Sequence, residues 1–188
     1  MAQNERLGNG ADCLFILRLI HVRGNLILEQ TLFRCDHNLV AMKLVSACLL
    51  GVNCNYEAKN WLNPDLLKQF AKGELFPVCP EILGGLPVPR VPAEIQGGDG
   101  SDVLDKTAKV VNEKGADVTS EFVRGAFTVL GIAQQVGAKE VLFTERSPSC
   151  GCGKVFDGSF SCKFRKGDGV TVALLKRNEI KVTSVKVS

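Results

Sequence analysis

The 188-residue chain lacks the features that mark nucleic-acid-binding and membrane-spanning proteins. It has no run of five or more Lys and Arg residues, and its formal net charge of +3 is too small to indicate an anionic partner. The apolar run at residues 13–20 is interrupted by Arg18, is too short to cross a bilayer and is a poor signal peptide. We therefore expect neither a membrane segment nor a nucleic-acid partner.

Cysteine is abundant, yet its most familiar spacing is missing. The chain has eight cysteines and no Cys-x-x-Cys pair, which argues against a structural zinc ribbon. A disulfide framework would suit a small secreted chain, whereas this chain is long enough to bury a core and is 45% hydrophobic. We predict free thiols in a reducing, cytoplasmic compartment.

Residues 1–41 differ in pattern from the rest of the chain. Met42 opens an apolar stretch that would make a good native start directly on a first strand. We predict that residues 1–41 are an N-terminal extension, from a non-native start or poorly ordered, and that residues 42–188 form a single domain. The extension contains four residues that we discount as ligands: Cys13, Cys35, His21 and His37.

Strand and helix patterns alternate from Met42 onward. Short apolar runs predict strands at residues 44–47, 75–78, 139–144 and 180–185. Stretches with one apolar face predict helices at residues 65–72, 120–136 and 169–176. This alternation is typical of an α/β fold. We predict a mostly parallel sheet with helices on both faces, a Rossmann-like three-layer sandwich.

Several segments between these elements carry loop signals. Pro recurs every two or three residues within residues 84–92, so this stiff segment is a wall of a site or a surface linker, and its closeness to Cys79 favours the wall. The Gly-Gly-Asp-Gly stretch at residues 97–100 predicts a hairpin turn rather than a phosphate-binding loop. Residues 102–112 predict at most a short strand. The Gly-rich and aromatic residues 151–168 predict an ordered loop or hairpin over a site.

Three cysteines each follow a predicted strand, namely Cys48, Cys79 and Cys150. Because the carboxyl ends of parallel strands meet at one edge of a sheet, these side chains should converge there. Three thiolates would bind a soft metal centre, and an iron–sulfur cluster with three protein ligands keeps one iron open to a substrate. Cys54 and Cys152 are candidates for a fourth ligand. Alternatively, Cys150 and Cys152 form a redox disulfide, or Cys150 is a small buried residue in a turn.

Five motifs follow one another along the chain. They are Ser-Ala-Cys-Leu-Leu-Gly at residues 46–51, Cys-Pro-Glu-Ile-Leu-Gly-Gly-Leu-Pro-Val-Pro-Arg at 79–90, Asp-Val-Thr at 117–119, Ser-Pro-Ser-Cys-Gly at 147–151 and Asp-Gly-Ser-Phe at 157–160. Together they resemble the thiouracil desulfurase family. The resemblance implies that Cys48, Cys79 and Cys150 hold a four-iron four-sulfur (4Fe-4S) cluster. It also implies that the substrate is a thiolated nucleobase whose sulfur binds the fourth iron.

The chemistry expected of such a site needs no net redox change. A soft iron attracts the thiocarbonyl sulfur and polarises its carbon, so that water replaces the sulfur. Glu81 is the carboxylate best placed for the proton transfers, with loop capping as its alternative role. Ser147 and Ser149 are candidate catalytic residues that would hydrogen-bond cluster sulfur or substrate, unless they only shape the turn at Pro148.

Three further residues are candidates for substrate binding: Asn53, Tyr56 and Arg90. Arg90 would contact a base oxygen, with a surface salt bridge as the alternative. After the residue equivalent to Cys54 the family often has Arg-Tyr-Asp-Gly, where this chain has Asn-Tyr-Glu-Ala at residues 55–58. If that Arg and Asp contact substrate in the family, thiouracil specificity does not transfer to this chain.

Two other functions fit the same residues. One is sulfur transfer in base or tRNA thiolation, and the other is a non-catalytic iron–sulfur or redox-sensing module. The weak net charge disfavours a tRNA partner. We predict an enzyme, a non-redox 4Fe-4S-dependent desulfurase acting on a small-molecule thiolated base, and the sequence leaves the oligomeric state open.

Overall fold

The computed structural model describes residues 15–22, 25–32 and 42–187, and the chain divides into two units, Met1–Leu39 and Val40–Ser188. In the first unit, β1 (Phe15–Val22) pairs antiparallel with β2 (Asn25–Leu32) over their full length, two strands that the sequence analysis did not predict. The division lies close to the predicted boundary, and the nature of the extension stays a prediction. Cys13, Cys35 and His37 lie outside the described residues.

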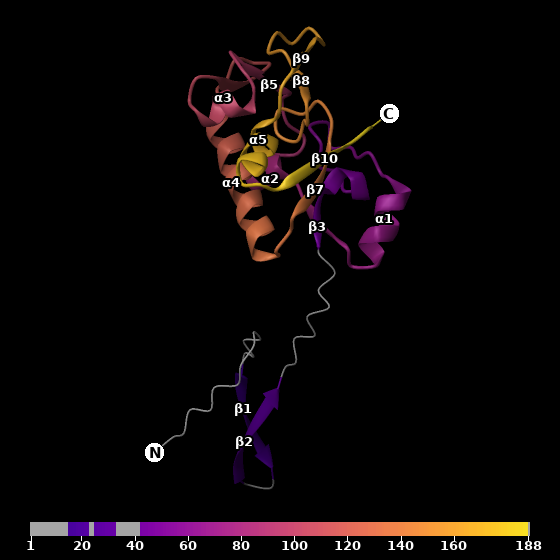
Figure 1. Cartoon of the computed structure of the whole chain (residues 1–188), viewed down its shortest axis with the longest axis vertical. Coiled ribbons are helices and arrows are strands. Elements are labelled where there is room, and N and C mark those ends of the chain that lie inside the picture. Colours follow the sequence, from indigo (N-terminus) through magenta and orange to yellow (C-terminus); the bar gives the residue numbers. More distant parts are fainter. Residues whose placement is uncertain (1–14, 23–24, 33–41, 188) are drawn as a thin grey trace. The chain divides into compact units, whose positions relative to one another are not determined.

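The second unit is organised around a four-stranded parallel sheet (Figure 1). Its order is β10-β7-β3-β4, and each neighbouring pair runs parallel. The strands are β3 (Lys43–Ser46), β4 (Leu75–Val78), β7 (Glu140–Thr144) and β10 (Lys181–Val185). All four lie within one residue of the predicted runs, and the predicted mostly parallel sheet is confirmed.

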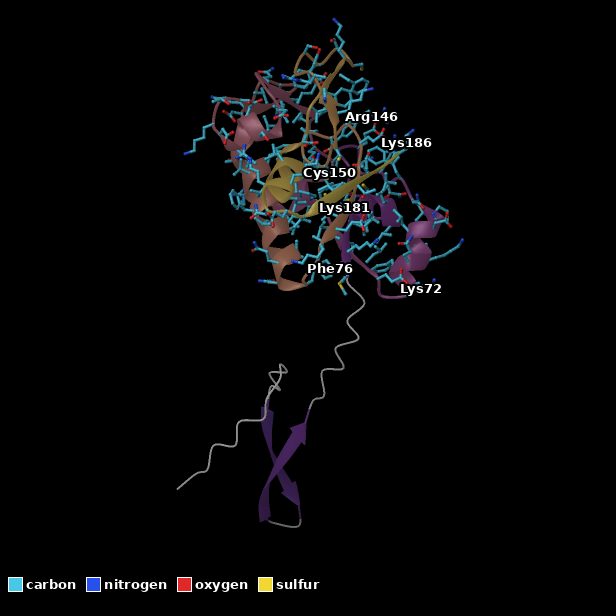
Figure 2. The ribbon with its side chains drawn as sticks, in the orientation of Figure 1. Lys72, Phe76, Arg146, Cys150, Lys181 and Lys186 are labelled. Atoms are coloured by element: carbon cyan, nitrogen blue, oxygen red, sulfur yellow. The ribbon has the colours of Figure 1, made fainter. Side chains whose placement is uncertain are left out.

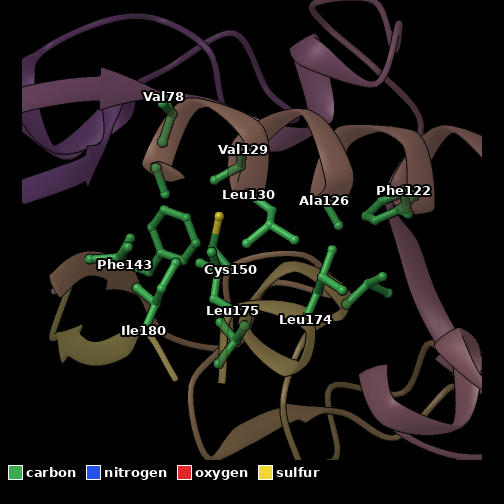
Figure 3. Packing of buried hydrophobic residues seen from close by; sticks show 14 of the residues in the cluster. Val78, Phe122, Ala126, Val129, Leu130, Phe143, Cys150, Leu174, Leu175 and Ile180 are labelled. Atoms are coloured by element: carbon green, nitrogen blue, oxygen red, sulfur yellow. The ribbon is translucent and has the colours of Figure 1, made fainter. Parts of the chain in front are cut away.

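Helices cover both faces of this sheet, as predicted. Successive side chains of a strand point to opposite faces. Leu44 of β3 therefore packs in the main core with α4 (Thr119–Gln135) and α5 (Val170–Arg177). The next residue, Val45, packs in a second cluster with Leu66 of α1 (Pro64–Ala71) and Leu49 of the 3-10 helix η1 (Ala47–Leu50). Figure 3 shows part of the main core, where buried side chains of α4 and α5 meet around Phe143 and Cys150.

The segment between β4 and α4 differs in part from its prediction: a short strand does form within residues 102–112, whereas a further strand and a helix were not predicted. Here β5 (Ala93–Gln96) pairs antiparallel with β6 (Lys109–Asn112), and α3 (Gly100–Leu104) lies between them. The hairpin turn predicted at residues 97–100 is wrong, because Asp99 begins a helix instead. Its carboxylate accepts a hydrogen bond from the Ser101 N–H at 2.8 Å, and the Asp102 carboxylate accepts one from the Asp99 N–H at 2.8 Å. Such a reciprocal capping box satisfies the free N–H groups of a helix start.

Two small elements complete the walls of the site. The antiparallel hairpin of β8 (Lys154–Phe156) and β9 (Phe164–Lys166) confirms the hairpin predicted within residues 151–168. The short helix α2 (Pro80–Leu83) packs on α4. A Cβ atom on Gly84 would collide with the Glu121 carbonyl oxygen, and one on Gly125 would collide with the Pro80 carbonyl oxygen. Glycine at both positions therefore lets the two helices approach closely.

Within the described ranges, every helix is too short or too polar to span a membrane.

Candidate functional site

A cavity of about 610 Å³ lies where three parallel strands end. Its lining includes Ser46, the last residue of β3, Val78, the last of β4, and Thr144, the last of β7. This is the sheet edge at which α/β proteins bind ligands, since loops from several strands converge there. The volume lies in the range of sites for small molecules. The cavity is therefore the candidate functional site.

Cys48, Cys79 and Cys150 all line this cavity. Cys48 lies in η1 just after β3 and is 8% exposed, whereas Cys79 precedes α2 directly after β4. Cys150 follows β7 in the loop that leads to the hairpin, and it is 7% exposed. Figure 2 places Cys150 in the interior of the larger unit, and Figure 3 shows its side chain between Phe143 and Leu130. The three strand ends thus bring these cysteines to one cavity.

A fourth cysteine, Cys54, joins the same lining and is 2% exposed. It packs with Cys48, and Cys79 donates a weak thiol hydrogen bond to the Cys54 carbonyl oxygen at 3.8 Å. A hydrogen bond with the Cys48 thiol, together with burial, raises the pKa of Cys54 to about 12. A hydrogen bond with Cys54 and burial raise the pKa of Cys79, and burial is the main cause of the raised pKa of Cys150. These thiols are therefore protonated at neutral pH, and any metal that bound them would have to displace the protons.

The donor set fits a cluster better than a single ion. Among the described residues, no three His, Cys, Asp or Glu side chains converge closely enough to hold one metal ion. A four-iron cluster asks for a different arrangement, because each thiolate binds a separate iron and the ligands stand apart around the cluster. Several thiols on one cavity, from different loops, supply the soft donors that iron–sulfur clusters take. The residues present fit such a group.

Three of the predicted residues lie away from the cavity lining: Asn53, Ser149 and Cys152. The Ser149 side chain is fully buried and shares a 2.8 Å hydrogen bond with Thr171. Asn53 is exposed, and its Oδ1 accepts a hydrogen bond from the Asn60 side chain at 2.6 Å. The Cys152 thiol lies 3.8 Å from the Val182 carbonyl oxygen. The proposed roles of these three residues therefore lack a contact with the cavity.

Arg90 lines the cavity but is engaged by the protein itself. Its Nε donates to Glu81 Oε2 at 2.5 Å, and its two terminal nitrogens each donate to the Cys54 carbonyl oxygen at 3.1 Å. The ion pair is buried, with 6% of the Arg90 side chain and 14% of the Glu81 side chain exposed. The alternative of a salt bridge is therefore realised, although the pair is largely buried and not on the surface, and the geometry favours positioning of the Cys54 loop over contact with a base.

Glu81 links this ion pair to the loop that carries Cys150. The Ser147 hydroxyl donates to Glu81 Oε1 at 3.2 Å. The Ser147 oxygen also accepts hydrogen bonds from the backbone N–H groups of Ser149 at 3.0 Å and Cys150 at 3.1 Å. Glu81 and Ser147 both line the cavity, so the structure brings these two predicted catalytic residues together. One hydrogen-bonded chain thereby joins the loops of Cys54, Cys79 and Cys150.

Aromatic residues and the Pro-rich segment close the cavity. Leu86, Pro87 and Pro92 line it, which confirms that residues 84–92 form a wall. Tyr56 lies at the exposed rim, with 42% of its surface accessible. Phe160, from the loop between β8 and β9, also lines the cavity.

The sequence analysis missed Glu94, which holds this aromatic loop in place. The carboxylate accepts hydrogen bonds from the Gly158 N–H at 2.9 Å and the Phe160 N–H at 3.1 Å. Glu94 is only 7% exposed and comes from β5, an element that the periodicity of the sequence did not predict. In the sequence, the only sign of this buried role is that an acidic residue stands among apolar neighbours.

Comparison with known proteins identifies the family of the chain. The family model of 2-thiouracil desulfurase matches residues 44–186. A Bacillus subtilis (strain 168) protein described as "Uncharacterized protein YbbK" is 44% identical over 143 residues, covering 76% of this chain and 95% of the relative. A solved structure named as the [4Fe-4S]-dependent thiouracil desulfidase TudS is 41% identical with a TM-score of 0.69, covering 76% of this chain and 89% of that one. The chain belongs to the 2-thiouracil desulfurase family.

Proposed function

We propose that the protein is an iron–sulfur-dependent desulfurase that converts a thiolated pyrimidine base to its oxo form. Cys48, Cys79 and Cys150 would hold a 4Fe-4S cluster. The observation that carries the proposal is that these three cysteines, from three strand ends, line one cavity together with Glu81 and Ser147. The family match and the name of the similar solved structure support the same chemistry.

The overall reaction needs only water as co-reactant. A carbon–sulfur double bond is exchanged for a carbon–oxygen double bond, and hydrogen sulfide leaves, so no external oxidant or reductant is consumed. When bound, a cluster with three protein ligands would supply a soft iron that binds the thiocarbonyl sulfur.

The residues of the chain would supply the proton transfers and the orientation. Glu81 presents a carboxylate to the cavity and would take a proton from the attacking water, with Ser147 fixing Oε1 by its 3.2 Å hydrogen bond. Arg90 would keep Oε2 in place and hold the Cys54 loop by its two 3.1 Å hydrogen bonds. Cys54 lines the same cavity and stays a candidate fourth ligand.

The proposal extends to the compartment and the partner. All six cysteines among the described residues are free thiols, which supports a reducing, cytoplasmic environment. A cavity of about 610 Å³ suits a small molecule.

Anaerobic reconstitution with iron and sulfide tests the proposal, with sulfide release from 2-thiouracil and 4-thiouracil as the readout. We expect a brown protein that releases sulfide from at least one of them. Glu81→Gln should keep the visible absorbance of the cluster and lose most turnover, whereas Glu57→Gln, on an exposed turn outside the cavity lining, should change neither. A cluster-loaded wild-type protein that releases no sulfide would overturn the proposed activity.

A further inference from the structure

The hydroxyl group of Ser46 is a buried donor without a partner. Ser46 opens the first of the five motifs, is 2% exposed and lines the cavity. Its Oγ has no hydrogen-bond partner within the described part of the chain. A serine at the start of a helical turn usually caps the free N–H groups with this oxygen, yet Ser46 makes no such bond to η1. Because a buried polar group left unpaired is destabilising, this hydroxyl indicates an acceptor that binding supplies.

The position of Ser46 at the end of β3 directs its side chain toward Cys150. Successive side chains of a strand alternate between faces, so Ser46 points to the same face of the sheet as Leu44. Leu44 and Cys150 belong to the same buried core, part of which is shown in Figure 3. β3 is also the neighbour of β7, and the loop after β7 carries Cys150. The Ser46 hydroxyl is close enough to the Cys150 thiol to lower its pKa, although burial, the larger effect, raises it.

Two other hydroxyl groups lie near Cys150 in the sequence, and both are engaged. Ser147 donates to a carboxylate at 3.2 Å, and its oxygen accepts two backbone N–H groups. Ser149 shares a 2.8 Å hydrogen bond with Thr171. Of these three serines, Ser46 alone retains a hydroxyl hydrogen for a new acceptor.

The strength of a sulfur atom as an acceptor depends on its charge. A neutral thiol is a weak acceptor, so the Ser46 hydroxyl stays unpaired beside Cys150. A thiolate that binds iron carries negative charge, and hydrogen bonds to charged groups are about twice as strong as those between neutral groups. The charge of Glu81 also acts against a thiolate at Cys150, so a nearby donor is needed to offset it.

We propose that Ser46 is a positioning residue for the cofactor, and that its hydroxyl donates an O–H···S hydrogen bond to the Cys150 sulfur when this cysteine is a ligand of the cluster. The inference rests on the proposed 4Fe-4S centre. No covalent bond forms or breaks, since the hydroxyl keeps its proton. Such a hydrogen bond holds the ligand in place, and it raises the reduction potential because it stabilises the more negative, reduced form of the cluster.

Two variants of Ser46 separate the donor from the space that it fills. Ser46→Ala removes the hydroxyl and little volume, whereas Ser46→Thr keeps the hydroxyl on a β-branched side chain that suits a strand. Thr171→Val is the matched control. Thr171 is fully buried, lies outside the cavity lining and carries a hydroxyl that already has a partner.

The first measurement is urea unfolding of the reduced, cofactor-free protein. Ser46→Ala should unfold at a higher urea concentration than the wild type, because it removes a buried hydroxyl that has no partner. Thr171→Val should unfold at a lower concentration, since it leaves the Ser149 hydroxyl unpaired. A lower midpoint in Ser46→Ala would show that this hydroxyl already stabilises the folded chain, and it would overturn the inference.

The second measurement compares the cluster-loaded proteins. In Ser46→Ala the equilibrium constant for one-electron reduction should fall roughly threefold to tenfold, which lowers the reduction potential by about 30–60 mV. Iron release to a chelator should be faster by roughly tenfold. Electron–nuclear double resonance of the reduced cluster in H2O and D2O should detect an exchangeable proton in the wild type that is missing in Ser46→Ala. Ser46→Thr should match the wild type in potential and proton signal, and Thr171→Val should keep the proton.

The outcomes distinguish the role of Ser46 from the proposed function. Either an unchanged potential or a retained proton signal in Ser46→Ala would overturn the inference and leave the desulfurase activity standing. A lowered potential and a missing proton, in a protein whose wild type releases no sulfide, would support the role of Ser46 and refute the activity. A wild type that takes up no cluster would refute both.

Discussion

Replacing Arg90 by methionine should destabilise the protein strongly, because Arg90 carries the charge of a buried ion pair. The substitution keeps an unbranched apolar stem of similar length but removes every donor. Glu81 then loses its 2.5 Å partner while 14% exposed, and the Cys54 carbonyl oxygen loses two hydrogen bonds. Leaving one partner of a buried ion pair unpaired costs about 3–5 kcal/mol. For a chain of this size that loss lowers Tm by about 6–20 °C.

Arg177 is the matched control for this prediction. Its guanidinium also makes two hydrogen bonds to one carboxylate, Asp105, at 2.9 and 2.7 Å. Here 41% of the Arg177 side chain and 57% of the Asp105 side chain are exposed, so water screens the pair. Arg177→Met should therefore cost only a small fraction of what Arg90→Met costs, although the two sites have similar bonding.

Urea unfolding of the reduced, cofactor-free protein, followed by circular dichroism, measures both losses under identical conditions. The double variant Arg90→Met with Glu81→Gln adds a second check, because no charge stays buried once both partners are neutral. It should be more stable than Arg90→Met alone. Equal losses in Arg90→Met and Arg177→Met, or a double variant that shows the full sum of the two single losses, would refute the reasoning from burial.

Three further predictions concern the ligands, the acid stability and the helix contact behind the site. Cys150→Ser should abolish the visible absorbance of the reconstituted cluster, whereas Cys152→Ser should leave it largely intact. Two lysines and a threonine lower the pKa of Glu140 from 4.5 to about 2, so its stabilisation is present above pH 4.5 and is lost as the pH falls toward 2. Glu140→Gln should therefore cost about 1 kcal/mol at pH 7, with the difference from wild type vanishing near pH 2 in urea unfolding. Gly125→Ala should lower stability by about 1–3 kcal/mol, because its Cβ would collide with the α2 backbone, whereas Gly131→Ala, with open space around its Cβ, should raise it by up to about 1 kcal/mol.

Each of these predictions has a result that would contradict it. If the cluster survived in Cys150→Ser and was lost in Cys152→Ser, then Cys152 and not Cys150 would be the ligand. If the difference in unfolding free energy between Glu140→Gln and wild type stayed constant from pH 7 to pH 2, the lowered pKa of Glu140 would not contribute to stability. Equal effects of the two alanine substitutions would show that α2 and α4 can separate at little cost.

The main sheet and its helices could be predicted because their periodicity is local. Val141 to Phe143 are all fully or nearly buried, and the uninterrupted apolar run in the sequence is typical of a strand covered on both faces. The apolar face of α4 could be recognised in the sequence as well, because Phe122, Ala126 and Val129 recur at helical spacing and are all buried.

β5, α3 and the pairing of β5 with β6 could not be predicted on the same basis. Each element has four or five residues, which is too short for a period to stand out, and the two glycines before Asp99 carry a turn signal that outweighs the capping box. The parts of the site that depend on contacts distant in the sequence were missed for a related reason. Glu94 reaches a backbone loop more than sixty residues away, and nothing local to Glu94 encodes that partner.

Because contacts distant in the sequence cannot be predicted locally, the prediction succeeded for the three cysteines and failed for the surroundings of Arg90. The carboxyl ends of parallel strands lie at one edge of the sheet, so the sequence could place Cys48, Cys79 and Cys150 at that edge. They share one cavity because β7, β3 and β4 are also neighbours in the sheet, an order that the sequence did not reveal. The surroundings of Arg90 do not, because they depend on how the Pro-rich segment folds back onto the Cys54 loop. Arg90 binds that loop and Glu81 together, and Ser147 joins Glu81 to the Cys150 loop. The loops of Cys54, Cys79 and Cys150 are therefore held together by hydrogen bonds within the protein. A site fixed in this way would bind a cluster with little further ordering of the chain, and substitutions in the chain of hydrogen bonds should impair cluster uptake as well as stability.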